Sequence, residues 1–198
     1  MKEQNTKTGT HMQAAVLAVF AALIAAGCFI AVPIGPVPIV LQNMLAILAG
    51  CVLGGAQGAA AVGLFLVAGC IGLPVFSGGR GGIAAVTGPT GGFLVGYFFA
   101  ALIAGSVVGK PLADEKPFEK KRLLTIAAVG LAGFAAVYVP GTYQYMRLTG
   151  SSPAAAFSAC VLPFLPGDAV KLLILVPAAA RLRPVAARYL IPPKQKQA

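Results

Sequence analysis

Apart from Arg181 at the end of the last run, Asp168 and Lys171 are the only charged residues within the long apolar runs that we predict to span a membrane. Their i, i+3 spacing places both side chains on one face of a helix. A charged side chain at the centre of a membrane helix costs about 2.5–3.5 kcal/mol. In a structural interpretation, Asp168 caps the helix that begins after Pro166-Gly167, and Lys171 neutralises it. We favour a functional interpretation, in which the pair forms the polar floor of a ligand cavity, because a cap alone does not require a lysine.

A second candidate cation, Arg80, lies in the loop Ser77-Gly-Gly-Arg-Gly-Gly82. Its glycines let the backbone approach a ligand closely. Together with Asp168 and Lys171, Arg80 leaves this end of the protein net positive, which suits a substrate that carries a carboxylate. The alternative is an interfacial arginine that holds a lipid phosphate.

Two amides and two tyrosines lie near the same predicted end of the spans. Gln42 and Asn43 would either bind a ligand amide or pair with a neighbouring helix. Tyr143 and Tyr145 would belong to an aromatic belt at the membrane surface or line an apolar ligand slot.

Catalytic and metal-binding sets are missing from the sequence. The one histidine, His11, precedes the first apolar run, and Asp168 has no second acid within the predicted spans. There is no Gly-x-x-x-x-Gly-Lys-Ser/Thr phosphate loop. We therefore predict no enzyme activity, no metal site and no resident cofactor.

The elements that position these residues are predicted to be membrane helices. The chain is 58% hydrophobic and 10% charged, whereas soluble domains are about 45–50% apolar and about 25% charged. We predict an all-α integral membrane protein, a bundle of six transmembrane helices. The spans are expected near 12–32, 39–54, 55–73, 91–108, 123–145 and 154–182. They form one membrane domain, 12–185, between a polar N-terminal tail, 1–11, and a basic C-terminal tail, 186–198.

The basic residues indicate the orientation of the bundle. Twelve of the fifteen fall into three clusters, which are Lys2 and Lys7; Lys110, Lys116, Lys120, Lys121 and Arg122; and Arg181, Arg183, Arg188, Lys194 and Lys196. Basic clusters beside spans face the cytoplasm, and an even number of spans puts all three on one side. We therefore predict a multi-pass protein of the cytoplasmic membrane with both termini cytoplasmic. Nucleic-acid binding is disfavoured, since no folded polar domain presents a basic face.

The first predicted span carries a stripe of small residues at every fourth position: Ala14, Ala18, Ala22 and Ala26. Such a stripe permits close approach of another helix. It would either pack within the protein or dock a partner membrane subunit.

A polar pocket without an energy source suggests a protein that binds a solute and relies on partners to move it. A self-sufficient carrier or channel for a small vitamin-like carboxylate is the alternative. A self-sufficient carrier or channel would pass solute across a membrane as an isolated chain, whereas a partner-dependent binding protein would mainly bind it.

Three motifs give the chain a resemblance to a known family: Val32-Pro-Ile-Gly-Pro-Val-Pro-Ile-Val-Leu-Gln42, the loop 72–79 that leads into Gly88-Pro-Thr-Gly-Gly92, and Pro166-Gly-Asp-Ala-Val-Lys171. The three motifs occur in the same order as in the BioY family, and the resemblance to this family covers roughly residues 12–185. Its members are the biotin-specific substrate-binding (S) components of energy-coupling-factor (ECF) transporters. Val40 is a departure, because the family usually has threonine there, and it puts one hydroxyl contact in doubt.

The resemblance implies a six-helix bundle that captures biotin with high affinity at its outward side. It implies that Asp168 and Lys171 bind the ureido ring or the carboxylate, and that residues 75–88 close over the ligand. The implied partners are a transmembrane coupling subunit and two cytoplasmic ATPases. They would dock through the alanine stripe.

Overall fold

The computed structural model describes the backbone of residues 2–32 and 39–190. Six longer helices occur in the predicted order: α1 (Lys2–Ala26), α2 (Gln42–Leu53), α3 (Gly55–Cys70), α5 (Gly91–Val108), α6 (Lys120–Thr149) and α8 (Leu165–Leu190). Between them lie the short helices α4 (Ile83–Thr87) and α7 (Pro153–Cys160) and a 3-10 turn, Leu162–Phe164. Strands β1 (Ala31–Val32) and β2 (Ile39–Val40) form one short antiparallel pair.

The helical membrane class predicted from composition is confirmed. Three helical stretches are long and apolar enough to cross a membrane: Gly91–Val108, Lys120–Thr149 and Pro153–Leu190. Three further apolar helices are shorter, at His11–Ala26, Gln42–Leu53 and Gly55–Cys70.

The predicted boundaries differ from the structure at both ends of the chain. Helix α1 begins at Lys2, so the segment expected as a polar tail, 1–11, is continuous with the first helix. The last apolar run is divided at Val161–Phe164, where Pro163 lies in a 3-10 turn, and α8 then continues to Leu190. The segment 33–38 of the first motif and the tail residues 191–198 lie outside the described residues.

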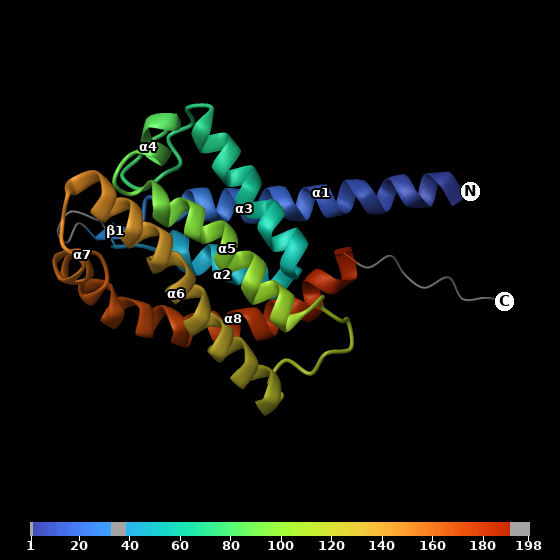
Figure 1. Cartoon of the computed structure of the whole chain (residues 1–198). Helices are drawn as coiled ribbons and strands as arrows, with labels where there is room; N and C mark the ends of the chain where they lie inside the picture. Colours follow the sequence, from blue (N-terminus) through green and yellow to red (C-terminus); the bar gives the residue numbers. More distant parts are fainter. Residues whose placement is uncertain (1, 33–38, 191–198) are drawn as a thin grey trace.

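The members of the three basic clusters that fall within residues 2–32 and 39–190 belong to segments at one end of the bundle. Figure 1 shows the start of α1, the end of α8 and the connection between α5 and α6 together, opposite α4 and α7. We refer to the end with the basic clusters as the basic end and to the other as the α4–α7 end. This arrangement is what the charge pattern requires if all three clusters face one side of a membrane.

Arg183, which the sequence analysis placed in the C-terminal basic cluster, is buried at the basic end of the bundle. Its side chain is 0% exposed. It donates two hydrogen bonds to the Glu115 carboxylate, at 2.7 and 2.8 Å, and others to the carbonyls of Gly109, Lys110 and Cys51. Arg122 forms a further ion pair with Glu115 at 3.2 Å. Arg183 therefore ties the connection between α5 and α6 to α8 and to the end of α2.

Glu115 is expected to make stability depend on pH. Burial acts to raise the pKa of Glu115, but the hydrogen bonds and charge of Arg183, together with Arg122, hold this pKa below its ordinary value of 4.5. A lowered folded-state pKa gives stability that is present above the unfolded-state pKa and is lost as the pH falls through the folded-state value. Glu115→Gln should therefore lower the unfolding temperature at neutral pH and flatten its decline in acid. Thermal unfolding in detergent between about pH 7 and pH 3 measures this.

The adjacent exposed acid Asp114 supplies the control, because it makes none of these contacts. Asp114→Asn should retain the acid-dependent loss of stability of the unmodified chain. Equal unfolding profiles for Glu115→Gln and Asp114→Asn would contradict the role of Glu115.

Candidate functional site

A cavity lies at the α4–α7 end, between the helices and the loop that precedes α4. The space in it that is accessible to a water-sized sphere is about 40 Å³, so the side chains around it are closely packed in this structure. The lining residues are Val40, Asn43, Phe76, Ser77, Arg80, Ala85, Thr90, Phe93, Leu94, Tyr97, Val137, Tyr138, Phe164 and Lys171.

One side of the cavity carries a buried polar cluster from three helices. Lys171 Nζ donates to Asn43 Oδ1 at 2.9 Å and to Asp168 Oδ1 at 3.0 Å. Asn43 Nδ2 also donates to Asp168 Oδ1, at 3.1 Å, and the Tyr138 hydroxyl donates to Asp168 Oδ2. The predicted Asp168–Lys171 pair is thus an ion pair, and the structure adds Asn43 and Tyr138 to it.

The position of Asp168 in the first turn of α8 is favourable for a carboxylate, because the N-terminal end of a helix is positive. Asp168 is 5% exposed, and the cavity wall is formed by Lys171, Asn43 and Tyr138 rather than by Asp168 itself. Asp168 therefore orients the groups that face the cavity.

The hydrogen-bonding capacity of this cluster is not used up. An ammonium group has three N–H donors, and two of those on Lys171 are engaged. The Tyr138 oxygen donates its proton to Asp168 and keeps acceptor lone pairs. The cluster can therefore both donate to and accept from a neutral polar ligand group.

Arg80 lies on the opposite side of the cavity. Its backbone pairs with that of Phe76 across a turn that contains Gly78 and Gly79, whose φ values of 75° and 68° favour glycine. The guanidinium donates to the Ser77 carbonyl at 3.1 Å and to the Thr90 hydroxyl at 3.3 Å. Both acceptors are neutral, so the positive charge of Arg80 is not balanced by these contacts.

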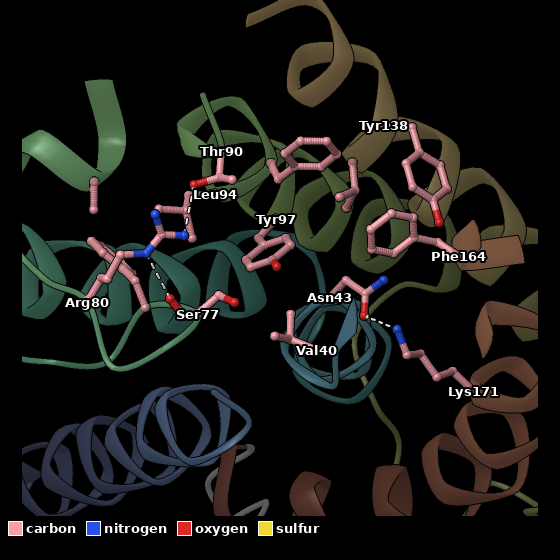
Figure 2. Close-up of a pocket in the computed structure, with 14 residues that line it drawn as sticks. Val40, Asn43, Ser77, Arg80, Thr90, Leu94, Tyr97, Tyr138, Phe164 and Lys171 are labelled. Carbon is pink, nitrogen blue, oxygen red and sulfur yellow. Dashed lines mark hydrogen bonds between the residues drawn. The ribbon is translucent and has the colours of Figure 1, made fainter. Parts of the chain in front are cut away.

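Apolar and aromatic side chains separate the two polar sides. Figure 2 shows Tyr97 between the Arg80 loop and the Asn43–Lys171 pair, and Leu94, which also lines the cavity, next to Thr90 and Arg80. Phe164 packs edge-on against Tyr138, with ring centroids 6.3 Å apart. Val40 also lines the cavity, so the position where the family usually has threonine contributes an apolar contact here.

Three of the predicted ligand-binding residues lie outside the cavity lining: Asp168, which acts behind it, Gln42 and Tyr143. Gln42 is fully buried, and its Nε2 donates to the carbonyls of Ile24 at 3.0 Å and Val75 at 2.8 Å, so it joins helices as in the alternative interpretation. Tyr143 is 62% exposed and lies in a separate outer groove. The tyrosines that reach the cavity are Tyr97 and Tyr138, which sequence reasoning missed.

The alanine stripe faces outward. Ala14, Ala18, Ala22 and Ala26 are all exposed, whereas Phe20, Ala21 and Ile24 supply the buried face of α1. Packing of the stripe within the protein, one of the two sequence-based alternatives, is therefore wrong.

Comparison of the sequence with known proteins shows to which family the chain belongs. The model of the BioY family matches residues 1–188. The chain belongs to the BioY family. A probable biotin transporter BioY from Pyrococcus horikoshii is 38% identical over 171 residues, covering 86% of this chain and 96% of that protein. The biotin transporter BioY from Thermotoga maritima is 33% identical, with coverage of 83% and 92%.

A solved structure extends the match to the BioY fold. The crystal structure of the S-component for biotin from an ECF-type ABC transporter superposes with a TM-score of 0.72. It is 32% identical and covers 92% of this chain and 94% of the other. The family resemblance inferred from the three motifs is thereby confirmed, and the chain has the S-component fold.

Proposed function

We propose that this chain is the substrate-specific S component of an ECF transporter and that it binds biotin in the cavity at the α4–α7 end. The observation that carries the proposal is the cavity's division into a neutral polar side, an apolar middle and a cationic side. Biotin has the same order of groups, with a ureido ring, a thiophane ring with an aliphatic chain, and a carboxylate.

The ureido ring is assigned to the Asn43–Asp168–Lys171–Tyr138 cluster. A ureido group is neutral, accepts hydrogen bonds through its carbonyl and donates two through its N–H groups. The spare donor of Lys171 matches the carbonyl, and the hydroxyl oxygens of Tyr138 and Tyr97 match the N–H groups. Because Asp168 already balances the charge of Lys171, this side does not call for an anionic ligand group.

The carboxylate is assigned to Arg80. Its guanidinium is held only by neutral oxygens, and a planar guanidinium binds carboxylates through charge-assisted hydrogen bonds. The aromatic and aliphatic lining between the two sides would cover the thiophane ring and the chain.

The arrangement in the membrane is also part of the proposal. Six membrane spans with both termini cytoplasmic would put the basic end in the cytoplasm and the cavity on the outer side of the cytoplasmic membrane. A transmembrane coupling subunit would dock on the exposed stripe of Ala14, Ala18 and Ala22, because small residues permit close helix approach. Two cytoplasmic ATPases would supply the energy, since this sequence has no phosphate loop.

Equilibrium binding of tritiated biotin to the purified chain in detergent tests the proposal. We expect saturable binding, and we expect Arg80→Gln to weaken biotin affinity about tenfold, as for loss of a charge-assisted hydrogen bond. Biotin amide, which lacks the negative charge, should bind the unmodified chain and Arg80→Gln equally.

Arg188→Gln is the matched control, because Arg188 is an exposed arginine near the end of α8, at the basic end and outside the cavity lining. It should bind biotin at equilibrium like the unmodified chain. Absence of saturable binding to the unmodified chain would refute the proposed function. If Arg80→Gln weakened the affinity for biotin and for biotin amide equally, the assignment of the biotin carboxylate to Arg80 would be refuted.

A further inference from the structure

A second hollow lies on the other face of α4. This outer groove is lined by Val86, Thr87, Gly92, Val95, Pro140, Tyr143, Gln144, Arg147 and Leu148. Its volume is about 550 Å³, which lies within the range of roughly 300–1,000 Å³ for small-molecule pockets. The groove is therefore large enough to admit a small molecule.

The wall between the outer groove and the cavity is one layer of residues thick. On α4, Ala85 lines the cavity, whereas the next residue, Val86, lines the groove. The same holds on α5, where Phe93 lines the cavity and the preceding residue, Gly92, lines the groove. The two hollows would become continuous if α4 moved away from α6.

Helix α4 is the weakly attached part of this wall. Within the described chain, no side chain of α4 is fully buried, and Ala85 and Val86, which pack against the core, are half-buried. The preceding loop is firmly held, because Phe76 is 2% exposed and the Gly82 N–H donates to the Gly69 carbonyl at 2.7 Å. At Gly82 the backbone has a φ of 86°, a conformation that favours glycine and provides a hinge.

Gln144 of α6 fastens the far end of α4. Its Nε2 donates to the carbonyls of Val86 at 2.9 Å and Gly88 at 2.6 Å. One side chain therefore holds two backbone carbonyls at the boundary between the groove and the cavity.

The groove also carries a cation suited to the ligand. Arg147 is exposed and forms no ion pair within residues 11–30 and 40–190. Tyr143, predicted as a ligand contact, lies in the same groove, with 62% of its surface exposed. A free arginine beside an apolar surface attracts a small carboxylate with an apolar body.

We infer that the outer groove is the access site of the ligand, where a monocarboxylate is first held at Arg147, and that Gln144 is the latch that keeps α4 closed between this site and the cavity. The inference rests on the proposed function. It assigns the groove a role in the rates of binding and release, while the cavity determines the contacts of the bound state. Gln144 is a positioning residue, because its hydrogen bonds go to α4 and not to the ligand.

The rates of tritiated biotin exchange test the latch. Gln144→Leu should accelerate release in a chase with unlabelled biotin about tenfold, as expected for loss of two hydrogen bonds that hold the closed state. Gln144→Glu keeps the shape of the side chain but cannot donate from an ionised carboxylate, so it should accelerate release as well. Gln13→Leu is the control, because Gln13 Nε2 also donates to a backbone carbonyl, that of Leu190, at the basic end.

Rapid mixing at low ionic strength tests the access site. Arg147→Gln should slow biotin association about threefold and weaken its salt dependence, as for loss of electrostatic steering. Association of biotin amide should be unchanged. Release of bound biotin should slow by about the same factor as association, because the groove lies on the path in both directions and the cavity determines the equilibrium affinity.

Two results would overturn the inference. The first is that Gln144→Leu and Gln144→Glu both release bound biotin no faster than the control Gln13→Leu. The second is biotin association with Arg147→Gln at the unmodified rate, as expected if the groove only holds lipid. Failure of the unmodified chain to bind biotin at equilibrium would instead refute the proposed function, so the two failures are distinguishable.

Discussion

Lys171→Met is expected to weaken biotin affinity by about ten- to a hundredfold, because it removes a hydrogen bond from a charged donor to the ligand, worth roughly 1.5–3 kcal/mol. Methionine fills a similar volume but removes the cavity-facing donor assigned to the ureido carbonyl. It also leaves the Asp168 carboxylate, 5% exposed, without its cation. Equilibrium titration with tritiated biotin, on protein that elutes as a single species in detergent, measures the effect.

Lys121→Met is the matched control, since Lys121 is an exposed lysine on α6 at the basic end. It should bind biotin like the unmodified chain. If Lys171→Met and Lys121→Met had comparable biotin affinities, the proposed role of Lys171 in binding would be contradicted.

Arg183→Met is expected to lower the unfolding temperature by about 6–12 °C, from a loss of roughly 3 kcal/mol or more in the free energy of unfolding. The change removes every hydrogen bond that Arg183 donates to Glu115 and to the carbonyls of Cys51, Gly109 and Lys110. Glu115 would keep only its ion pair with Arg122. Thermal unfolding in detergent at neutral pH measures the shift.

Arg181→Met provides the comparison two residues earlier in α8. Arg181 is exposed, and its guanidinium stacks on the Phe118 ring at 5.3 Å, a contact worth about 0.5–1 kcal/mol at exposed sites. Its unfolding temperature should change little. Equal shifts for the two variants would contradict the structural role of Arg183, and folded Arg183→Met should retain biotin affinity because the cavity lies at the other end of the bundle.

The sequence was sufficient to predict the features that depend on the cost of charge in an apolar medium. Asp168 and Lys171 stood out because neither is tolerated in hydrocarbon without a partner, and the structure pairs them. The basic clusters likewise predicted which chain segments lie together, since each flanks an apolar run. Arg80 was identified by its glycine-rich loop, which brings its side chain to the cavity.

Features that depend on helix rotation were beyond the sequence. Tyr138 and Tyr143 lie on one helix five positions apart, yet only Tyr138 reaches Asp168, because the packing of α6 against its neighbours decides which face turns inward. Gln42 and Asn43 are adjacent and similar in chemistry. Only Asn43 lines the cavity, since successive helical residues point in different directions.

Arg183 escaped prediction for a related reason. It belongs by sequence to a basic stretch at the end of the last helix, and such stretches usually face solvent. Its partner Glu115 lies in a loop 68 positions earlier in the chain. A contact over that separation follows from the tertiary fold and has no local pattern.

The structure of the chain with biotin bound is the most direct test of the proposed site. It should show the ureido ring within hydrogen-bonding distance of Lys171, on the side of Asn43 and Tyr138, with the carboxylate at Arg80 and α4 closed over the ligand. Biotin bound elsewhere, with the first turns of α8 packed against α2 and α6 as they are in this structure, would contradict the account.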